Sequence, residues 1–184
     1  NILFAAHSER YSRKKNDMYL NDEIVSEALS FGKPDKIAYY EKPWIKKTRQ
    51  IYAGQYNEAL SSNNIPSKYL KRWFGNQKIH YFSHHKSHAA AGYYTSPFEE
   101  SAILVVDGIG EWDVVTIWHG KGNDVRKVKS IKYPNSLGLF YSAVTQYLGF
   151  LNYGDEYKVM GMSCYGNSIY VEKLKKIIEI NNDG

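Results

Sequence analysis

Cysteine and long apolar runs are scarce in this sequence, and each scarcity excludes a class of protein. The single cysteine, Cys164, cannot form an internal disulfide, which fits a reducing compartment such as the cytoplasm. No apolar run is long enough to span a bilayer, and the mean hydropathy is negative. The first residues, Asn1 to Phe4, lack the basic segment of a signal peptide. We therefore expect a cytoplasmic protein without a membrane partner.

The length of the chain limits the number of domains, and its charge indicates the kind of partner. The 184 residues suffice for one well-cored domain or slightly more, and neither an internal repeat nor a low-complexity tract interrupts them. The formal net charge is +5, and lysine and arginine gather between Arg10 and Lys15 and between Gly120 and Lys132. Such clusters favour anionic partners such as nucleotides, although plain solvated faces explain several of them equally well. The tyrosines show no nucleic-acid recognition spacing, so no nucleic-acid partner is expected.

Hydrophobic periodicity predicts alternating strands and helices, and therefore an α/β fold. Strands are expected at 2–6, 36–40, 78–82 and 102–106, with an antiparallel hairpin formed by 113–118 and 126–133. Helices are expected at 22–29, 45–60, 68–74, 137–148 and 170–180. The apolar run 102–106 is continuous and branched rather than alternating, which indicates a buried parallel strand.

Three histidines within five positions form the most informative cluster. Alanines 89–91 favour a helix over Ser87 to Tyr94. If its first turn begins near His84, then His84 and His88 share one face, whereas His85 points about a hundred degrees away. Two imidazoles four residues apart can aim their nitrogens at one divalent cation.

A third ligand is available at Asp107, directly after the strand 102–106. Open α/β sheets place their ligands at the carboxyl ends of strands. Two histidines and one carboxylate with open positions suit Fe(II), Mn(II) or Zn(II) better than Ca(II) or Mg(II). An isolated HxxxH pair is also a common accident on helices, but the sequence Asp-Gly-Ile-Gly-Glu that begins at Asp107 is difficult to explain by packing alone.

Six segments, in order, resemble the amino-terminal part of the nodulation-type and antibiotic O-carbamoyltransferases. They are ERYSRKK from Glu9, HHKSHAA from His84, SPF from Ser96, DGIGE from Asp107, SLGLFYS from Ser136 and EYKVMGM from Glu156. Together they cover most of the chain between Arg10 and Gly166. Any one of them is a weak signal, whereas six in the same order are a strong one.

The resemblance implies an actin and sugar-kinase-like (ribonuclease-H-like) mixed sheet flanked by helices. In this family a separate carboxyl-terminal domain, which uses Mg, makes carbamoyl adenylate from carbamoyl phosphate and ATP. The amino-terminal domain then passes the carbamoyl group to a hydroxyl of a sugar or natural-product acceptor. The resemblance also implies an iron ion, Fe(II), at this second site, held by His84, His88 and Asp107.

The same resemblance indicates that residues 1–184 are an incomplete amino-terminal carbamoyl-transfer domain. The family's first strand and hairpin are expected before Asn1. A further aspartate ligand, the remainder of the domain and the adenylate-forming domain are expected after Gly184. Asn16 stands where many relatives have histidine. A fragment of this kind is expected to be inactive alone, and a homodimer stays compatible with the sequence.

Several further residues are candidates for substrate contacts. Backbone N–H groups at Gly108 and Gly110, together with Lys15, could hold a phosphate, and Ser136 and Gly138 could assist. Ser136 could equally be the N-cap of the helix 137–148.

Two neighbours of the predicted ligands keep open roles. His85 could be a base or, more simply, a packed histidine that supports a ligand. Glu111 could support a ligand or lie at the surface.

Two other functions are compatible with these residues. One is a relative of the enzymes that transfer threonylcarbamoyl to tRNA, which share the expected fold. The other is a non-catalytic nucleotide-binding module, which would bind nucleotide without any metal dependence.

Overall fold

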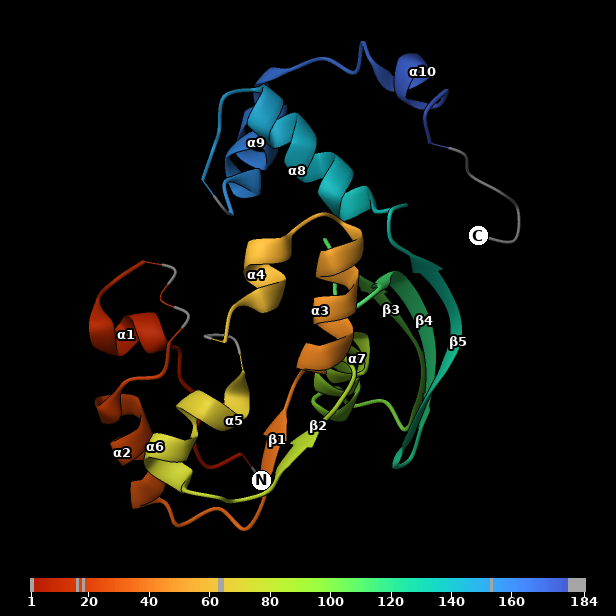
Figure 1. Ribbon diagram of the computed structural model, residues 1–184. Coiled ribbons are helices and arrows are strands. Elements are labelled where there is room, and N and C mark those ends of the chain that lie inside the picture. Colours follow the sequence, from red (N-terminus) through yellow and green to blue (C-terminus); the bar gives the residue numbers. More distant parts are fainter. Residues whose placement is uncertain (1, 16, 18, 63–64, 153, 179–184) are drawn as a thin grey trace.

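Two small sheets and the helices around them organise the chain in the computed structural model, which describes residues 2–178 except 16, 18, 63–64 and 153 (Figure 1). One sheet has two parallel strands and the other has three antiparallel strands. The mixed α/β class expected from the sequence is therefore present. None of the described helices is both long enough and apolar enough to cross a membrane.

The three-stranded sheet has the order β3 (Glu100–Val106), β4 (Asp113–Lys121) and β5 (Asp124–Lys132). The predicted hairpin is confirmed, and Gly122 takes its turn with φ of +55°. The prediction of a buried parallel strand is wrong, because β3 pairs antiparallel with β4 and only Val105 of its residues is buried. A continuous run of branched residues indicates a strand but does not determine its direction.

The parallel pair consists of β1 (Ile37–Tyr39) and β2 (Ile79–Tyr81), in register from Ile37 opposite Ile79. Four helices connect them: α3 (Pro43–Tyr52), α4 (Tyr56–Leu60), α5 (Pro66–Tyr69) and α6 (Lys71–Phe74). The helix expected at 45–60 is split, since Gly54 lies at φ of +74° between α3 and α4. Because the two strands are parallel, the residues that follow them emerge at the same edge.

Helix α7 (His84–Tyr94) lies between the two sheets (Figure 1) and begins at His84, as the sequence predicts. Its buried side packs on the antiparallel sheet and forms the main apolar core with it. That core comprises Ala89, Tyr93, Val105, Trp118 and Val125. The core therefore fixes the face of α7 that carries the histidines relative to the end of β3.

The remaining helices flank these sheets. Near the amino terminus lie α1 (Ser8–Ser12) and α2 (Asp22–Ser30), and Asn21 caps α2 by accepting from the Ile24 N–H at 2.9 Å. Beyond the antiparallel sheet lie α8 (Leu137–Tyr147), α9 (Glu156–Met162), a 3-10 turn at Ser163–Tyr165 and α10 (Val171–Leu174).

Two sequence predictions at the ends of the chain are corrected. Described residues 2–6 form no strand, because no strand within the described part of the chain pairs with them. The helix expected at 170–180 is helical only over α10, and its last two residues fall outside the described range.

Two glycines test how tightly α7 packs on the antiparallel sheet. A Cβ at Gly120 of β4 would lie 2.8 Å from the Tyr93 ring, whereas a Cβ at Gly92 would meet nothing within 4 Å. We expect Gly120→Ala to lower the free energy of unfolding by about 1–3 kcal/mol through overpacking. Gly92→Ala, the matched control in the helix, should raise it by about 0.5–1 kcal/mol. Urea denaturation of both variants measures the difference, and equal stabilities would contradict this packing.

Candidate metal centre and adjoining pocket

His84, His88 and Asp107 come together where the first turn of α7 meets the end of β3. Nε2 of His84 lies 3.0 Å from Nε2 of His88 and 3.0 Å from Oδ2 of Asp107. Nε2 of His88 lies 3.7 Å from the same carboxylate oxygen. The pair four residues apart and the acid after the strand thus meet around one point, as the sequence suggests.

The spacing of these three atoms fits ligands of one small cation. Transition-metal bonds to imidazole nitrogen and carboxylate oxygen are about 2.1 Å long, so two ligands at right angles lie about 3.0 Å apart. Two of the three distances have this value, and the third needs only a small rotation. Apart from its ion-pair contacts with the histidines, the buried Asp107 Oδ2 has no hydrogen-bond partner among the described residues, which leaves its lone pairs for a cation shared with them. His88 is half exposed, which leaves an approach from solvent.

Glu41 stands behind His84, on the side away from Asp107. It follows β1, while His84 follows the parallel strand β2, so the two residues emerge at one sheet edge. Glu41 is only 3% exposed, its Oε1 accepts from Lys46 Nζ at 2.9 Å, and its Oε2 lies 3.6 Å from His84 Nδ1. The last distance is an ion-pair contact rather than a hydrogen bond. Glu41 therefore favours a proton on Nδ1 of His84, which leaves Nε2 for a cation.

The pKa values in the cluster follow from the position of the His84 imidazole between the carboxylates of Asp107 and Glu41. Burial alone would lower the pKa of His84, but Asp107 and Glu41 outweigh it and raise the pKa from 6.5 to about 9. The same contact with His84 lowers the pKa of Asp107 below its usual value. Without a cation, a proton on His84 thus compensates the two acids.

Glu111 lies inside the protein rather than at its surface, and it does not join the three-residue cluster. It is 9% exposed, and its Oε1 accepts from the Lys42 backbone N–H at 2.6 Å. Burial raises its pKa, which the N–H of Lys42 partly offsets. Glu111 therefore ties the turn after β3 to the start of α3.

His85 is also buried, with 1% exposure, and its ring centre lies 6.1 Å from that of His84 and 6.3 Å from that of His88. Its Nδ1 lies 2.8 Å from Oγ1 of Thr116 in β4. Its Nε2 lies 4.0 Å from Asp107 Oδ2 and has no hydrogen-bond partner among the described residues.

The glycines near Asp107 allow helices to approach it closely. A Cβ at Gly138 would lie 2.7 Å from Gly108 Cα and 2.8 Å from the Asp107 carbonyl oxygen. A Cβ at Gly110 would lie 2.9 Å from the His85 ring. The N–H of Gly108 donates to Asp107 Oδ1 at 2.7 Å, and the N–H of Gly110 donates to the Asp113 carbonyl oxygen at 3.0 Å. Both predicted phosphate donors are therefore engaged within the chain.

Ser136 is the N-cap of α8, the simpler of its two predicted roles. Its hydroxyl accepts from the Leu139 N–H at 3.0 Å and donates to the Gly108 carbonyl oxygen at 2.5 Å. It thereby fastens the amino-terminal end of α8 onto the residues that follow Asp107.

A cavity of about 440 Å³ adjoins Asp107 at this helix end. Its lining comprises Asp107, Gly108, Ile109, Gly138, Leu139, Tyr141, Ser142, Gly154 and Glu156. Gly108 and Gly138 from the predicted set thus line it, whereas Gly110 and Ser136 do not. Lys15 lies outside the lining, with its Nζ 5.6 Å from the ring centre of Tyr157, the neighbour of Glu156.

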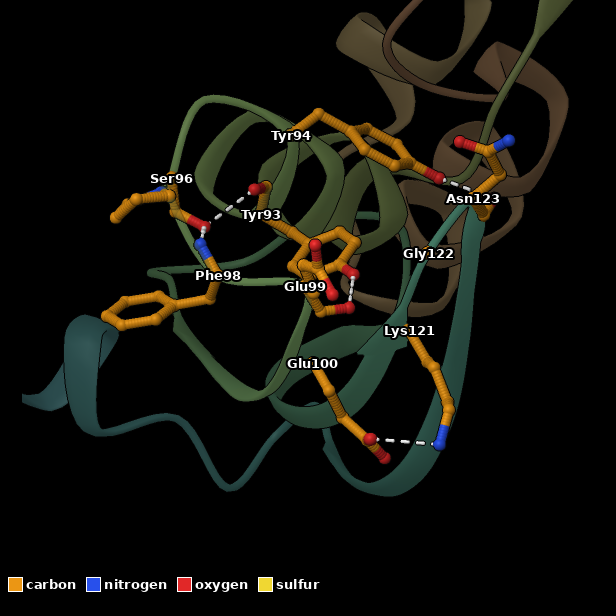
Figure 2. A pocket seen from close by; sticks show the side chains of 10 residues that line it. Tyr93, Tyr94, Ser96, Phe98, Glu99, Glu100, Lys121, Gly122 and Asn123 are labelled. Atoms are coloured by element: carbon orange, nitrogen blue, oxygen red, sulfur yellow. Dashed lines mark hydrogen bonds and ion pairs between the residues drawn. The ribbon is translucent and has the colours of Figure 1, made fainter.

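A larger cavity, of about 670 Å³, lies at the other end of α7, away from His84 (Figure 2). Its polar groups bond to one another: Tyr94 donates to the Asn123 carbonyl oxygen at 2.8 Å, and Lys121 pairs with Glu100 at 2.9 Å. None of the predicted site residues lines it. Its size alone therefore does not make it the functional site.

Four functional candidates escaped the sequence predictions: Glu41, Thr116, Ser142 and Glu156. For Glu41 a signal existed, because parallel strands bring the residues at their carboxyl ends together. Ser142 donates to Glu156 at 2.5 Å across α8 and α9 in the cavity wall. No sequence pattern predicted that contact, nor the one between Thr116 and His85.

These features define a mixed α/β chain that could hold a cation between two histidines and an aspartate, beside a cavity at a helix amino terminus. Comparison with known proteins identifies its family. A family model described as carbamoyltransferase N-terminus matches residues 1–182, so the chain belongs to the carbamoyltransferases.

Individual relatives agree with that assignment. The nodulation protein NolNO of Sinorhizobium fredii is 40% identical over 90% of this chain and 26% of its own length. An uncharacterized protein of Synechocystis is 34% identical over the whole chain and 34% of its own length. An uncharacterized protein of Methanocaldococcus jannaschii is 31% identical over 89% of this chain and 29% of its own length. The chain thus spans about a quarter to a third of these relatives.

The raised pKa of His84 predicts how pH affects the metal-free protein. The pair that His84 forms with the acids stabilises the fold fully below about pH 6.5, and this stabilisation is lost as pH rises through about 9. Zn(II) must displace the same proton, so its apparent affinity should rise about tenfold per pH unit over that window. Chelator competition between pH 6.5 and 8.5 measures the slope. An affinity that is independent of pH would show that His84 is not a ligand.

Glu41→Gln should weaken Zn(II) binding about tenfold, because His84 loses the carboxylate that orients it. Glu100→Gln is the matched control: Glu100 also pairs with a histidine, His119, and a lysine, Lys121, but at the far end of β3. The Zn(II) affinity of the Glu100→Gln variant should equal that of the unmodified protein. Unchanged affinity in Glu41→Gln, with circular dichroism showing an intact fold, would contradict the role of Glu41.

Proposed function

We propose that this chain transfers a carbamoyl group from carbamoyl adenylate to a hydroxyl of a sugar or natural-product acceptor. Carbamoyl phosphate and ATP would supply the adenylate in another domain of the full-length protein. The meeting of His84, His88 and Asp107 beside the cavity at α8 carries the proposal, because it combines a cation site with room for an activated acyl donor. Membership of the carbamoyltransferase family supports the reaction class.

Each part of the site has a role in this proposal. The carbamoyl adenylate would occupy the cavity beside Asp107, with its phosphate toward the amino-terminal end of α8, where the helix dipole favours an anion. Lys15, whose Nζ lies near the Tyr157 ring, would add a positive charge. The Ser142 and Glu156 pair would offer polar contacts to the donor or the acceptor. Attack by the acceptor hydroxyl forms the carbamate C–O bond and releases AMP, while the hydroxyl proton passes to solvent or a base.

A divalent metal, with Fe(II) as our proposal, would be held by His84, His88 and Asp107. When bound, it supplies a Lewis acid that stabilises negative charge on the carbamoyl oxygen and lowers the pKa of the acceptor hydroxyl. Glu41 would keep the Nε2 atom of His84 available for this ion. The protein otherwise contributes position and exclusion of water, since AMP is already a good leaving group.

The proposal extends to the architecture. We propose that residues 1–184 are part of an actin-like, ribonuclease-H-like domain, whose remaining strands and adenylate-forming partner domain belong to the rest of the full-length protein. The length of the relatives supports this, since the chain spans only 26% of NolNO.

The double variant His84→Ala with His88→Ala in the full-length protein tests the function. We expect acceptor carbamoylation to fall at least about a hundredfold, because the charge on the carbamoyl oxygen loses its stabilisation. Formation of carbamoyl adenylate should persist, since another domain performs it. Mass spectrometry of a panel of hydroxylated sugars detects the carbamates, and nucleotide analysis detects the adenylate.

His119→Ala is the control, because His119 pairs with Glu100 away from the cluster. It should retain both reactions. Full transfer by the double variant would refute the role of the metal. Nucleotide binding without any transfer by the unmodified protein would instead favour a non-catalytic module.

A further inference from the structure

A line of buried groups leads from the core of the antiparallel sheet to the metal candidate. Trp118 Nε1 lies 2.7 Å from Thr116 Oγ1, and Thr116 Oγ1 lies 2.8 Å from His85 Nδ1. The other nitrogen of that imidazole, Nε2, lies 4.0 Å from Asp107 Oδ2. Trp118, Thr116 and His85 are 5%, 0% and 1% exposed, so water has little access to any of them.

The chemistry of these groups fixes the direction of the hydrogen bonds. An indole N–H can only donate, so Thr116 Oγ1 accepts from Trp118. The Thr116 hydroxyl has one proton of its own to donate. Within the described chain, the side chains that this hydroxyl contacts are Trp118, which offers no acceptor, and His85, which offers Nδ1. If Nδ1 also donated, the hydroxyl proton would be buried without an acceptor, which is unfavourable. Thr116 therefore donates to Nδ1, and a neutral His85 carries its proton on Nε2.

The position of that proton determines what His85 can do. A nitrogen that carries a proton has no lone pair for a metal, so His85 is not a third imidazole ligand in this arrangement. Its Nε2 instead lies 4.0 Å from the carboxylate oxygen that His84 and His88 also approach. Of five buried side-chain polar atoms without partners in the described residues, three belong to His84, His85 and Asp107. His85 Nε2 and Asp107 Oδ2, which both lack a hydrogen-bond partner within the described residues, thus lie 4.0 Å apart.

We propose that His85 is a positioning residue: its Nε2–H, fixed by Thr116 and Trp118, donates to Asp107 Oδ2 and orients this carboxylate toward the cation. The inference rests on the metal site of the proposed function. The Gly108 N–H already holds Oδ1 at 2.7 Å, so a second donor on Oδ2 fixes the rotation of the carboxylate. One lone pair of Oδ2 then remains for the metal.

To form this hydrogen bond, the carboxylate of Asp107 would move rather than the imidazole of His85. The His85 ring is confined by the backbone at Gly110, where even a Cβ would come within 2.9 Å of it. Asp107 is less confined, since its side chain is 28% exposed and borders the cavity. A shift of about 1 Å would bring the 4.0 Å separation to hydrogen-bond length.

Nitrogen NMR of histidine in the full-length protein tests the tautomer directly. With ¹⁵N-labelled histidine, and His85→Gln to assign the signals, we expect His85 to be neutral with the proton on Nε2. Addition of Zn(II), a diamagnetic probe, should change the Nε2 signals of His84 and His88 to those of metal ligands while His85 keeps its proton. A proton on Nδ1 of His85, or loss of the Nε2 proton on Zn(II) addition, would overturn the proposal.

Three variants test whether this tautomer matters for the site. Thr116→Val keeps the shape but removes the hydroxyl, so Zn(II) affinity by chelator competition should fall about tenfold. Thr116→Ser restores the hydroxyl and should recover the affinity to within about twofold, which a purely steric role does not predict. In Trp118→Phe, Thr116 is free to accept from Nδ1, so both tautomers should appear in the NMR spectrum.

The outcomes separate this proposal from the proposed function. If Thr116→Val is less stable yet binds Zn(II) as the unmodified protein does, the positioning role is wrong while the metal site stands. If His84→Ala leaves Zn(II) affinity unchanged, or the unmodified protein binds none, the metal site itself is wrong and the role of His85 falls with it.

Discussion

The close approach of two helices to one short turn is the constraint on which this site depends. The residues that follow Asp107 lie against α7 on one side and α8 on the other. A side chain at Gly110 would meet the His85 ring, and one at Gly138 would meet the backbone of Asp107 and Gly108. Glycine at these two positions therefore brings the carboxylate to the histidines and the amino-terminal end of α8 to the cavity. Neither contact could form with a larger residue at the same backbone position.

Charge compensation is the second condition for assembling the cluster. Two carboxylates, Asp107 and Glu41, lie close to one imidazole with limited access to water, which would be unfavourable if both were left uncompensated. Lys46 pairs with Glu41, and a proton on His84 compensates Asp107. A divalent cation would take the place of that proton. In the proposed function, metal binding would therefore release this proton.

The antiparallel sheet links the site to the core. Trp118 contributes its ring to the core around α7 and its N–H to Thr116, which in turn contacts His85. Packing and chemistry therefore share the same residues on β4, and the orientation of the buried imidazole follows from the core. The position of His85 in the sequence left its role open. The contact with Thr116 gives its imidazole a defined environment.

The sequence by itself determined most of the local elements and the three side chains of the candidate site. Helical periodicity placed His84 and His88 on one face, and the cap residue Ser136 marked a helix start, because these features depend on neighbours within a few residues. The tertiary structure decided the rest. The antiparallel direction of β3, the placement of Glu41 behind His84 and the contact of Thr116 with His85 join residues distant in sequence. Such contacts depend on how sheets and helices pack, which no local pattern encodes.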